Sequence, residues 1–151
     1  MRAVVQRVSE ARVEVDGRTV AEIGRGLLVL LGVESGDSAE DALYISRKIA
    51  FLRIFPSPDG MKESDRSVKD TGGSVLIVPQ FTLLGDVRKG NRPSFTRSEE
   101  PGKAREVVEF VARKVEEEGI PVSVGAFQEH MHVHLVNDGP YTVLLDSKKT
   151  F

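Results

Sequence analysis

Two apolar runs constrain the fold of this chain more than any other feature. Leu27–Leu31 is an unbroken run of leucine and valine that follows Gly26, and Ser74–Val78 is a second run that precedes Pro79. Short runs of this kind, bounded by glycine or proline, are typical of strands buried on both faces. Proline cannot donate to a neighbouring strand, so Pro79 ends the second one. The sequence therefore predicts buried strands at the centre of a sheet.

A hairpin and two amphipathic helices surround these runs. Asp16-Gly17 separates two short alternating segments, and both residues tolerate the positive φ of a two-residue hairpin turn. Ser38 is the predicted N-cap of a first helix. Its apolar stripe consists of Ala42, Ile45, Ile49 and Leu52. A second helix is predicted around Pro101–Glu118, with Gly119 as its stop.

The remaining segments define the fold class. Ser57–Gly73 is polar and is predicted to be a loop with a short strand. Further strands are predicted at Val122–Val124, Met131–Val136 and Thr142–Leu145. Because strands gather at both ends of the chain and helices lie between them, we expect an α+β fold, a largely antiparallel β-sheet or partial barrel with two main helices. No repeat or linker interrupts the chain, so residues 1–151 are predicted to form a single domain.

Composition excludes several classes of protein. The chain has no cysteine, which rules out a disulfide framework, a thiol nucleophile and a thiolate zinc site. It has no membrane-length apolar run and no signal-peptide pattern, so we expect a cytoplasmic protein without a membrane partner. The net charge of −2 argues against bulk electrostatic binding of nucleic acid. An RNA partner would be held by a local patch.

Gln80-Phe81-Thr82 is the first candidate for chemistry. It leaves a buried strand, and such an exit exposes consecutive backbone N–H groups that can bind a carbonyl oxygen as charge develops on it. The alternative is a plain strand end with a surface threonine and a core phenylalanine. The second candidate is Asn137–Thr142, which is first of all a turn between two strands. Nothing local predicts a cis bond at Gly139-Pro140.

Two further clusters carry weaker signals. Arg88, Lys89 and Arg92, followed by Phe95, suit phosphate contact and stacking on a base or ribose, or simply form a solvated loop. At strand spacing, a histidine run shares one face, with Met131, Val133 and Leu135 on the other. This run is His130, His132 and His134. Three imidazoles can bind zinc, but the apolar face packs inward, so no metal is predicted.

Several catalytic motifs are absent. The chain has no G-x-S-x-G motif, its histidines are bunched together, and it contains neither a P-loop nor a dinucleotide fingerprint. The sequence therefore does not support a serine-triad hydrolase, a nucleoside triphosphatase or a dinucleotide-dependent enzyme. No cofactor is predicted.

Taken together, the segments resemble one family, the D-aminoacyl-tRNA deacylases. The matching segments follow the family's order and span nearly the whole chain. They are MRAVVQRVSEARVEVDG, IGRGLLVLLGVE, LRIF, VKDTGGSVLIVPQFTL, DVRKGNRPSF and LVNDGPYTVLLDS. Gln80-Phe-Thr-Leu83 and Asn137-Asp-Gly-Pro-Tyr-Thr142 correspond to the family's paired signature motifs.

The resemblance implies a homodimer with an active site at each subunit interface. One subunit would supply Gln80–Thr82, and the other would insert Gly139-Pro140 with a cis peptide bond. The carbonyl groups there would accept the substrate's α-amino group and crowd the position of an L side chain. The implied reaction is hydrolysis of the ester bond of D-aminoacyl-tRNA and mischarged glycyl-tRNA at the acceptor end, as chiral proofreading.

The resemblance also implies residue roles. Phe81 and Thr82 would aim their N–H groups at the ester oxygen, beside Gln80, as the catalytic segment. The Thr82 hydroxyl is interpreted as a positioning group, because no base is evidently placed to make it a nucleophile. The terminal ribose hydroxyl of the tRNA is a further candidate for assisting the reaction. Substrate binding and chiral selection would fall to Gly139, Pro140, Asn137 and Arg7.

The chain departs from the family pattern at three places. Pro79 replaces a usual serine, Tyr141 replaces a usual valine, and Ser64-Asp-Arg-Ser67 replaces a more apolar stretch. Two alternatives to the deacylase stay open from the sequence. One is a catalytically silent module that binds the tRNA acceptor end, which only Pro79 favours. The other is a metal-dependent hydrolase built on the histidine run.

Overall fold

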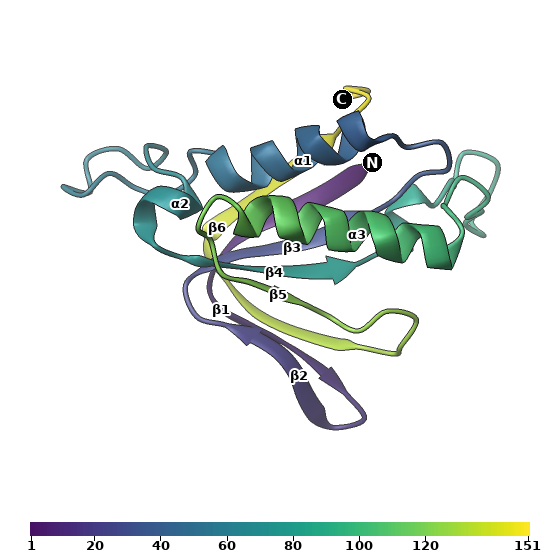
Figure 1. Cartoon of the computed structure of the whole chain (residues 1–151), viewed down its shortest axis with the longest axis horizontal. Coiled ribbons are helices and arrows are strands. Elements are labelled where there is room, and N and C mark those ends of the chain that lie inside the picture. The colour runs from purple at the N-terminus through teal and green to yellow at the C-terminus, as the bar shows by residue number, and fades with distance from the viewer.

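The structure is a computed structural model that describes all residues, 1–151. Its core is a six-stranded sheet with two main helices packed against it (Figure 1). The elements are β1 (Arg2–Val15), β2 (Arg18–Ile23), β3 (Gly26–Gly32), α1 (Ala39–Phe51), α2 (Val68–Thr71), β4 (Ser74–Pro79), the 3₁₀ turn η1 (Phe81–Leu84), α3 (Pro101–Glu116), β5 (Val122–Val124) and β6 (His132–Asp146).

The long strand β1 organises the sheet. Its first half pairs with β3, its second half pairs with β2 on the same side, and β6 runs along its other edge. The order β2-β1-β3-β4-β5 bends into a nearly closed, barrel-like sheet. The predicted hairpin turn is present, since Asp16 and Gly17 both have positive φ between β1 and β2.

The expectation of a largely antiparallel sheet is confirmed only in part, because the sheet is mixed. β1 is antiparallel to β2, β3 and β6, whereas β3, β4 and β5 run parallel. The cause is the position of the helices along the chain. α1 lies between β3 and β4, and α3 lies between β4 and β5. Such crossovers return the chain in its original direction, so the joined strands are parallel.

Both faces of the central strands are buried, as the two apolar runs predict. Leu27, Val29 and Ile77 point into the layer below α1 and α3. Leu28 and Leu76 point the other way, into a smaller core enclosed by the curved part of the sheet. The strands therefore have no solvent face, which explains why their sequences do not alternate.

Capping residues set the helix ends. Ser38 and Asp41 form the reciprocal capping box of α1. Burial alone would raise the pKa of Asp41, but hydrogen bonds from Ser147 and Ser38 outweigh it and lower the pKa to about 2. Ser67 and Asp70 form a second capping box, which starts α2. The expected short strand in this polar loop was wrong, and the Ser-x-x-Asp spacing was the available signal for a helix.

The Asn137–Tyr141 segment is not a turn between two separate strands. It lies within the single strand β6. Thr142 pairs with Gln6 and Asn137 pairs with Val8, so four residues of β6 stand opposite Arg7 alone and form a wide bulge. No helix of the structure combines the length and the apolarity needed to cross a membrane.

Candidate active site

The first half of the candidate site is the end of β4. The N–H of Gln80 donates to the Leu31 carbonyl over 2.8 Å, as the last bond that joins this segment to the sheet. The chain then turns into η1, whose Leu84 is fully buried. Because Phe81 and Thr82 begin this turn, their N–H groups have no acceptor within the chain. Two adjacent donors are thus left free at the protein surface.

Side chains complete this segment. The Gln80 amide donates to the Thr82 hydroxyl, which leaves the hydroxyl's own proton available to another acceptor. The Phe81 carbonyl accepts a hydrogen bond from the Ser98 hydroxyl over 3.2 Å. The Phe81 ring is 58% exposed and meets the Phe95 ring edge-on, at a centroid distance of 5.2 Å. The segment is therefore held from one side and open on the other.

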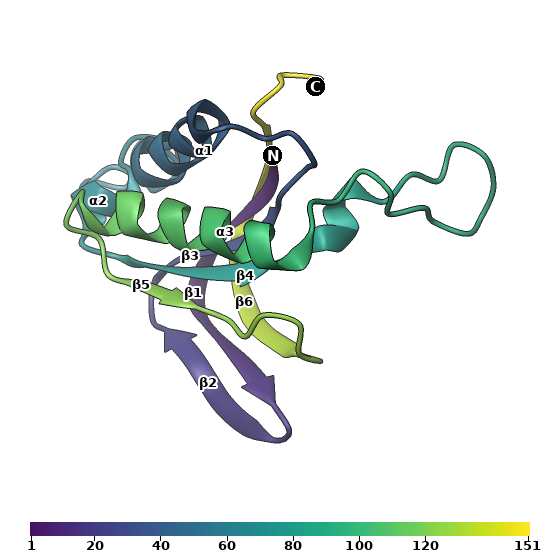
Figure 2. The ribbon, with the colours of Figure 1, turned by 45° about the vertical axis from the view of Figure 1, so that its right-hand side comes forward.

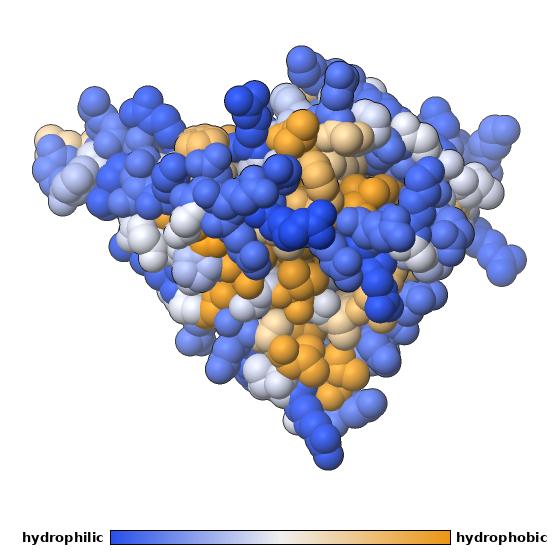
Figure 3. Space-filling view, viewed as in Figure 1, coloured by the Kyte–Doolittle hydropathy of each residue, from blue (hydrophilic) through white to orange (hydrophobic).

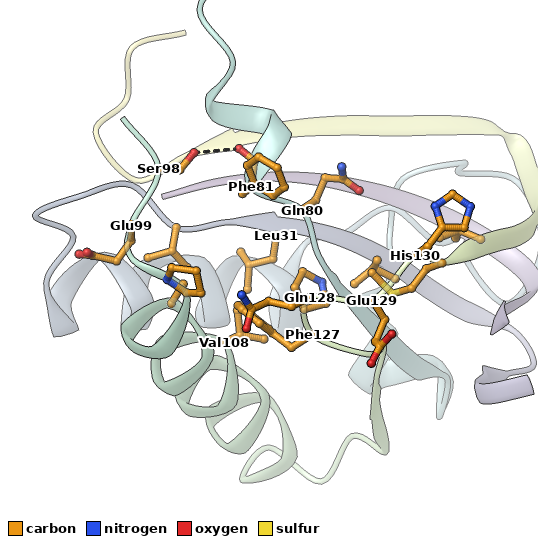
Figure 4. A pocket seen from close by; sticks show the side chains of 17 residues that line it. Leu31, Gln80, Phe81, Ser98, Glu99, Val108, Phe127, Gln128, Glu129 and His130 are labelled. Carbon is orange, nitrogen blue, oxygen red and sulfur yellow. Dashed lines mark hydrogen bonds between the residues drawn. The ribbon is translucent and has the colours of Figure 1, made fainter. Parts of the chain in front are cut away.

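A cavity of about 520 Å³ lies beside this segment. Figure 4 shows Phe81, Gln80 and His130 along one side of it, with Val108 and Phe127 opposite and Leu31 between them. Its floor is apolar, and its rim carries Ser98, Glu99, Gln128 and Glu129. A backbone hydrogen bond from Glu100 and the nearby Lys103 lower the pKa of Glu99, so the rim is negatively charged at neutral pH.

The predicted basic loop projects away from the body between η1 and α3 (Figure 2). Arg88 is bound to Asp86, with its Nε 2.9 Å from Oδ1. These hydrogen bonds hold the pKa of Asp86 well below its usual range. Lys89 and Arg92 are exposed and make no ion pair. Two of the three cations thus remain available to phosphate, and Phe95 packs on Phe81 instead of standing free.

The second half of the candidate site is the bulge of β6. Arg7, which shares the inward face of β1 with Ala3 and Val5, is only 3% exposed. Its Nε donates to the Asp138 carbonyl over 3.0 Å, and a second guanidinium nitrogen donates to the Ile54 carbonyl over 2.8 Å. The buried guanidinium therefore fixes the backbone of the bulge directly before Gly139.

Asn137 closes the base of the same bulge. Its amide nitrogen donates to the carbonyls of Arg7 and Tyr141, over 2.9 and 3.0 Å. Gly139 has φ +130°, and its bond to Pro140 is cis. Both residues are exposed at the tip. The four residues that the resemblance assigns to selection therefore lie together, with the glycine and proline presented to solvent.

The structure does not bring the two halves together within one chain. Pro79 is level with Leu31, and Leu31 is level with Ala3 on β1, whereas the bulge stands opposite Arg7. The two halves are thus separated by four residues along the strand direction, about 13 Å, and by three strand spacings, about 14 Å. Gln80, Phe81 and Thr82 form one group, and Arg7, Asn137, Gly139 and Pro140 form another.

The histidine run does not form a metal centre. His130 precedes β6 and lines the cavity, with its ring edge-on to His132 at 5.1 Å. His134 Nε2 lies 3.2 Å from a Glu14 carboxylate oxygen. No three acidic, histidine or cysteine residues converge to hold a metal ion. Met131, Val133 and Leu135 pack against the smaller core, which confirms the predicted inward face of this run.

Comparisons with known proteins extend this description. The family model described as D-Tyr-tRNA(Tyr) deacylase matches residues 4–146. The D-aminoacyl-tRNA deacylases of Thermotoga petrophila and Koribacter versatilis are 53% and 54% identical to this chain, each over 100% of both proteins. A solved structure described as a c-Myc DNA unwinding element binding protein has a TM-score of 0.90 at 37% identity, covering 97% of this chain and 98% of that one.

A second solved structure, described as a probable eukaryotic D-amino acid tRNA deacylase, has a TM-score of 0.79 at 18% identity and covers 95% of this chain and 97% of that one. At that identity it supports the fold alone. The matches define an ester hydrolase that acts on aminoacyl-tRNA. More narrowly, the chain belongs to the D-Tyr-tRNA(Tyr) deacylase family, and its activity is D-aminoacyl-tRNA deacylation, a step of D-amino acid proofreading.

Sequence reasoning missed several contributors to the two halves. Ser98 supports Phe81 from the segment before α3, and Phe127 lines the cavity from the loop after β5. From the polar loop after α1, Ser64 contacts Tyr141 of the bulge and Glu63 contacts Arg7. These residues have no motif of their own, so only the folded chain identifies them. The departure at residues 64–67 was the sole sequence signal.

Proposed function

We propose that the deacylase active site is completed by a second copy of the chain, with Gln80–Thr82 of one protomer facing Gly139-Pro140 of its partner. The supporting observation is the separation of these two segments within one chain, although both are exposed. A reaction centre that needs both segments requires a second protomer to deliver one of them. A two-fold arrangement would form two equal sites.

The surface around the bulge favours such an assembly. β6 pairs only with β1, so its other edge is unpaired. On this strand Val136 and Leu144 are 50% and 59% exposed on either side of the bulge. Apolar side chains on an unpaired strand edge favour association with another chain. Contact with a second copy would cover them and bring the bulge against its partner.

The free donors of η1 define the chemistry. In the proposed reaction, water attacks the carbonyl carbon of the aminoacyl ester, and the N–H groups of Phe81 and Thr82 bind the developing oxyanion. Each such donor stabilises the transition state by roughly 3–4 kcal/mol. The intermediate then expels the terminal ribose oxygen, which takes up a proton, and the free amino acid leaves. The ester is already activated, so positioning contributes most of the catalysis.

Thr82 acts in this scheme by orientation. Its hydroxyl accepts a hydrogen bond from the Gln80 amide, and no basic side chain is bonded to it. An amide is not a base, so the contact fixes the hydroxyl without activating it as a nucleophile. The hydroxyl can then hold the attacking water or the ester oxygen. The ribose hydroxyl next to the ester remains available to relay a proton.

The bulge supplies the selection. Exposed backbone at Gly139 and Pro140 would accept the substrate's α-amino group and occupy the space of an L side chain. D-amino acids direct their side chains elsewhere, and glycine has none, so we infer that D-aminoacyl-tRNA and glycyl-tRNA are both accepted. Selectivity by exclusion needs a rigid obstacle, and the buried Arg7 provides that rigidity by holding the Asp138 carbonyl.

The adjacent cavity suits the terminal nucleoside of the tRNA. Its size lies within the range of small-molecule sites, and it joins an apolar floor to a polar rim next to Phe81. Phe127 offers a ring to a base, while Ser98 and Gln128 offer hydrogen bonds at the rim. Figure 3 shows apolar surface gathered below α3, flanked by hydrophilic residues. The acceptor end would thus bind by stacking more than by charge.

The first experiment compares release of labelled amino acid from D-Tyr-tRNA, L-Tyr-tRNA and glycyl-tRNA at equal enzyme concentration. We expect rapid loss of the D and glycyl esters, with the L ester spared. Equal hydrolysis of D and L esters would contradict selection at the bulge.

Shared sites are tested by mixing two variants. One combines Phe81→Pro with Thr82→Ala, and the other lacks Gly139-Pro140 and so has lost the backbone that would bind the substrate's α-amino group; each alone is expected to be inactive. In a mixed dimer one site regains both intact segments, so we expect activity to return when the variants are refolded together. Refolding each variant alone is the control. If a mixture that contains verified mixed dimers stays inactive, the shared site is contradicted.

A further inference from the structure

The loop between α1 and α2 contacts the selecting bulge at one point and the Arg7 guanidinium beneath it at another. The Glu63 carboxylate lies 2.6 Å from a guanidinium nitrogen of Arg7. The Ser64 hydroxyl lies 2.5 Å from the Tyr141 hydroxyl, which links residues that are 77 positions apart. Both contacts come from the loop that the sequence left without a function.

The two contacts reach the bulge through one connected cluster. The guanidinium carbon of Arg7 lies 4.9 Å from the centre of the Tyr141 ring, so the ring covers a face of the cation. The same guanidinium holds the Asp138 carbonyl. Ser64 thus fixes the tip of a ring that packs on Arg7, and Arg7 fixes the backbone next to Gly139. These contacts connect the loop to the selecting segment through two side chains.

We propose that Ser64 and Tyr141 are positioning residues for chiral selection, and that their hydroxyl pair locks residues 57–66 onto the bulge. The lock limits movement of Gly139-Pro140 away from the position where it excludes an L side chain. This inference rests on the proposed selection by the bulge.

The loop does not need the pair in order to fold. Ser57 N–H donates to the Lys62 carbonyl over 2.7 Å, and Phe55 N–H donates to the Arg66 carbonyl over 2.9 Å. Ser64 itself is exposed. The loop is therefore closed by its own backbone, and the hydroxyl pair joins two segments that are already formed. Loss of the pair should loosen the bulge and leave the fold intact.

The test measures the ratio of kcat/KM for D-Tyr-tRNA to that for L-Tyr-tRNA in Tyr141→Phe, Ser64→Ala and the double variant. Each single change should lower the ratio about 2- to 10-fold, the effect of one hydrogen bond. The double variant should fall no further than the singles, because both remove one interaction. Ser64→Thr, which keeps a hydroxyl, should retain most of the ratio, and the melting temperature should stay within about 2 °C of the wild type in every case.

Tyr44→Phe removes the hydroxyl of the other tyrosine, on α1, and is the matched control with an unchanged ratio. Gly139→Ala in the same assay distinguishes failure of the Ser64–Tyr141 contact from failure of selection by the bulge. If Gly139→Ala lowers the ratio while Tyr141→Phe and Ser64→Ala leave it unchanged, the lock is wrong and selection by the bulge stands. If Gly139→Ala has no effect either, selection by the bulge fails and the lock fails with it.

Discussion

The two halves of the candidate site are built in opposite ways. At the end of β4, the groups proposed to act are backbone donors that the fold leaves without partners, and the side chains of Phe81 and Thr82 are exposed. In the bulge of β6, hydrogen bonds from Arg7 and Asn137 hold the backbone, and Arg7 is almost fully buried. Catalysis needs vacant donors aimed at the substrate, whereas exclusion needs an obstacle that does not yield. The contrast predicts that substitutions in the first half change rates, and that those in the second half change stability and selectivity.

Arg7→Ala should have the largest effect. It leaves the carbonyls of Ile54 and Asp138 without a buried donor, so we expect the free energy of unfolding to fall by about 3 kcal/mol. Urea unfolding measures this loss, and the D/L ratio should fall with it. Arg12→Ala is the control, because Arg12 is 42% exposed and its ion pair with Glu14 lies at the surface, where such pairs contribute little to stability. If both variants lose the same free energy of unfolding, the bulge of β6 is not held more firmly than the exposed surface.

Thr82→Ala should lower kcat about 10- to 100-fold, the range of one hydrogen bond to a charged group in the transition state. Because Thr82 is exposed, the unfolding midpoint should not move. Single-turnover rates separate the chemical step from product release, and Thr82→Ser should restore most of the rate. A loss of activity to the uncatalysed level, with a trapped acyl-enzyme in the wild type, would make Thr82 a nucleophile.

Gly139→Ala should affect selection more than folding. An added Cβ would lie 2.9 Å from an Arg7 nitrogen and 3.1 Å from the Tyr141 nitrogen, at a φ of +130° that L-residues rarely adopt. Relief of these contacts requires the bulge to move away from Arg7, which displaces the selecting backbone and costs about 1 kcal/mol in stability. We expect the D/L ratio to fall about 10-fold, measured on matched tyrosyl esters. Gly90→Ala, also at positive φ in an open loop, is the control for backbone strain alone.

Pro79→Ser should have the smallest effect, no more than about 3-fold in kcat/KM, because the catalytic donors are those of the residues beyond it. Pro79 pairs with Leu31 as the last residue of β4, and the next N–H still bonds to that strand. The proline was the only sequence feature favouring a silent binding module. A large gain of activity in Pro79→Ser would show that catalysis at the end of β4 depends on the side chain at position 79 as well as on backbone N–H groups.

Much of the fold was predictable, and the errors have physical causes. Helix α1 and the two buried strands followed from local patterns, because capping and periodicity act over a few residues. The mixed sheet was missed although the helices between the strands require parallel crossovers. The single strand β6 was missed because Asn-Asp-Gly-Pro is a turn sequence, whereas here it bulges from a ladder that β1 holds on both sides. The sequence correctly indicated that Asn137–Thr142 is irregular. Pairing with β1 on both sides makes this segment a bulge within one strand instead of a turn between two.

The sequence by itself determined the buried strands, the capped helices, the two candidate motifs and, by resemblance, the deacylase activity. These depend on residue types at short spacing. Tertiary structure decided that the two motifs lie at different places on one chain, that Arg7 is buried under the bulge, and that Ser64 meets Tyr141. Such contacts join residues far apart in the chain, and no local pattern encodes which of many polar side chains will meet. Only the closure of the sheet around β1 brings them together.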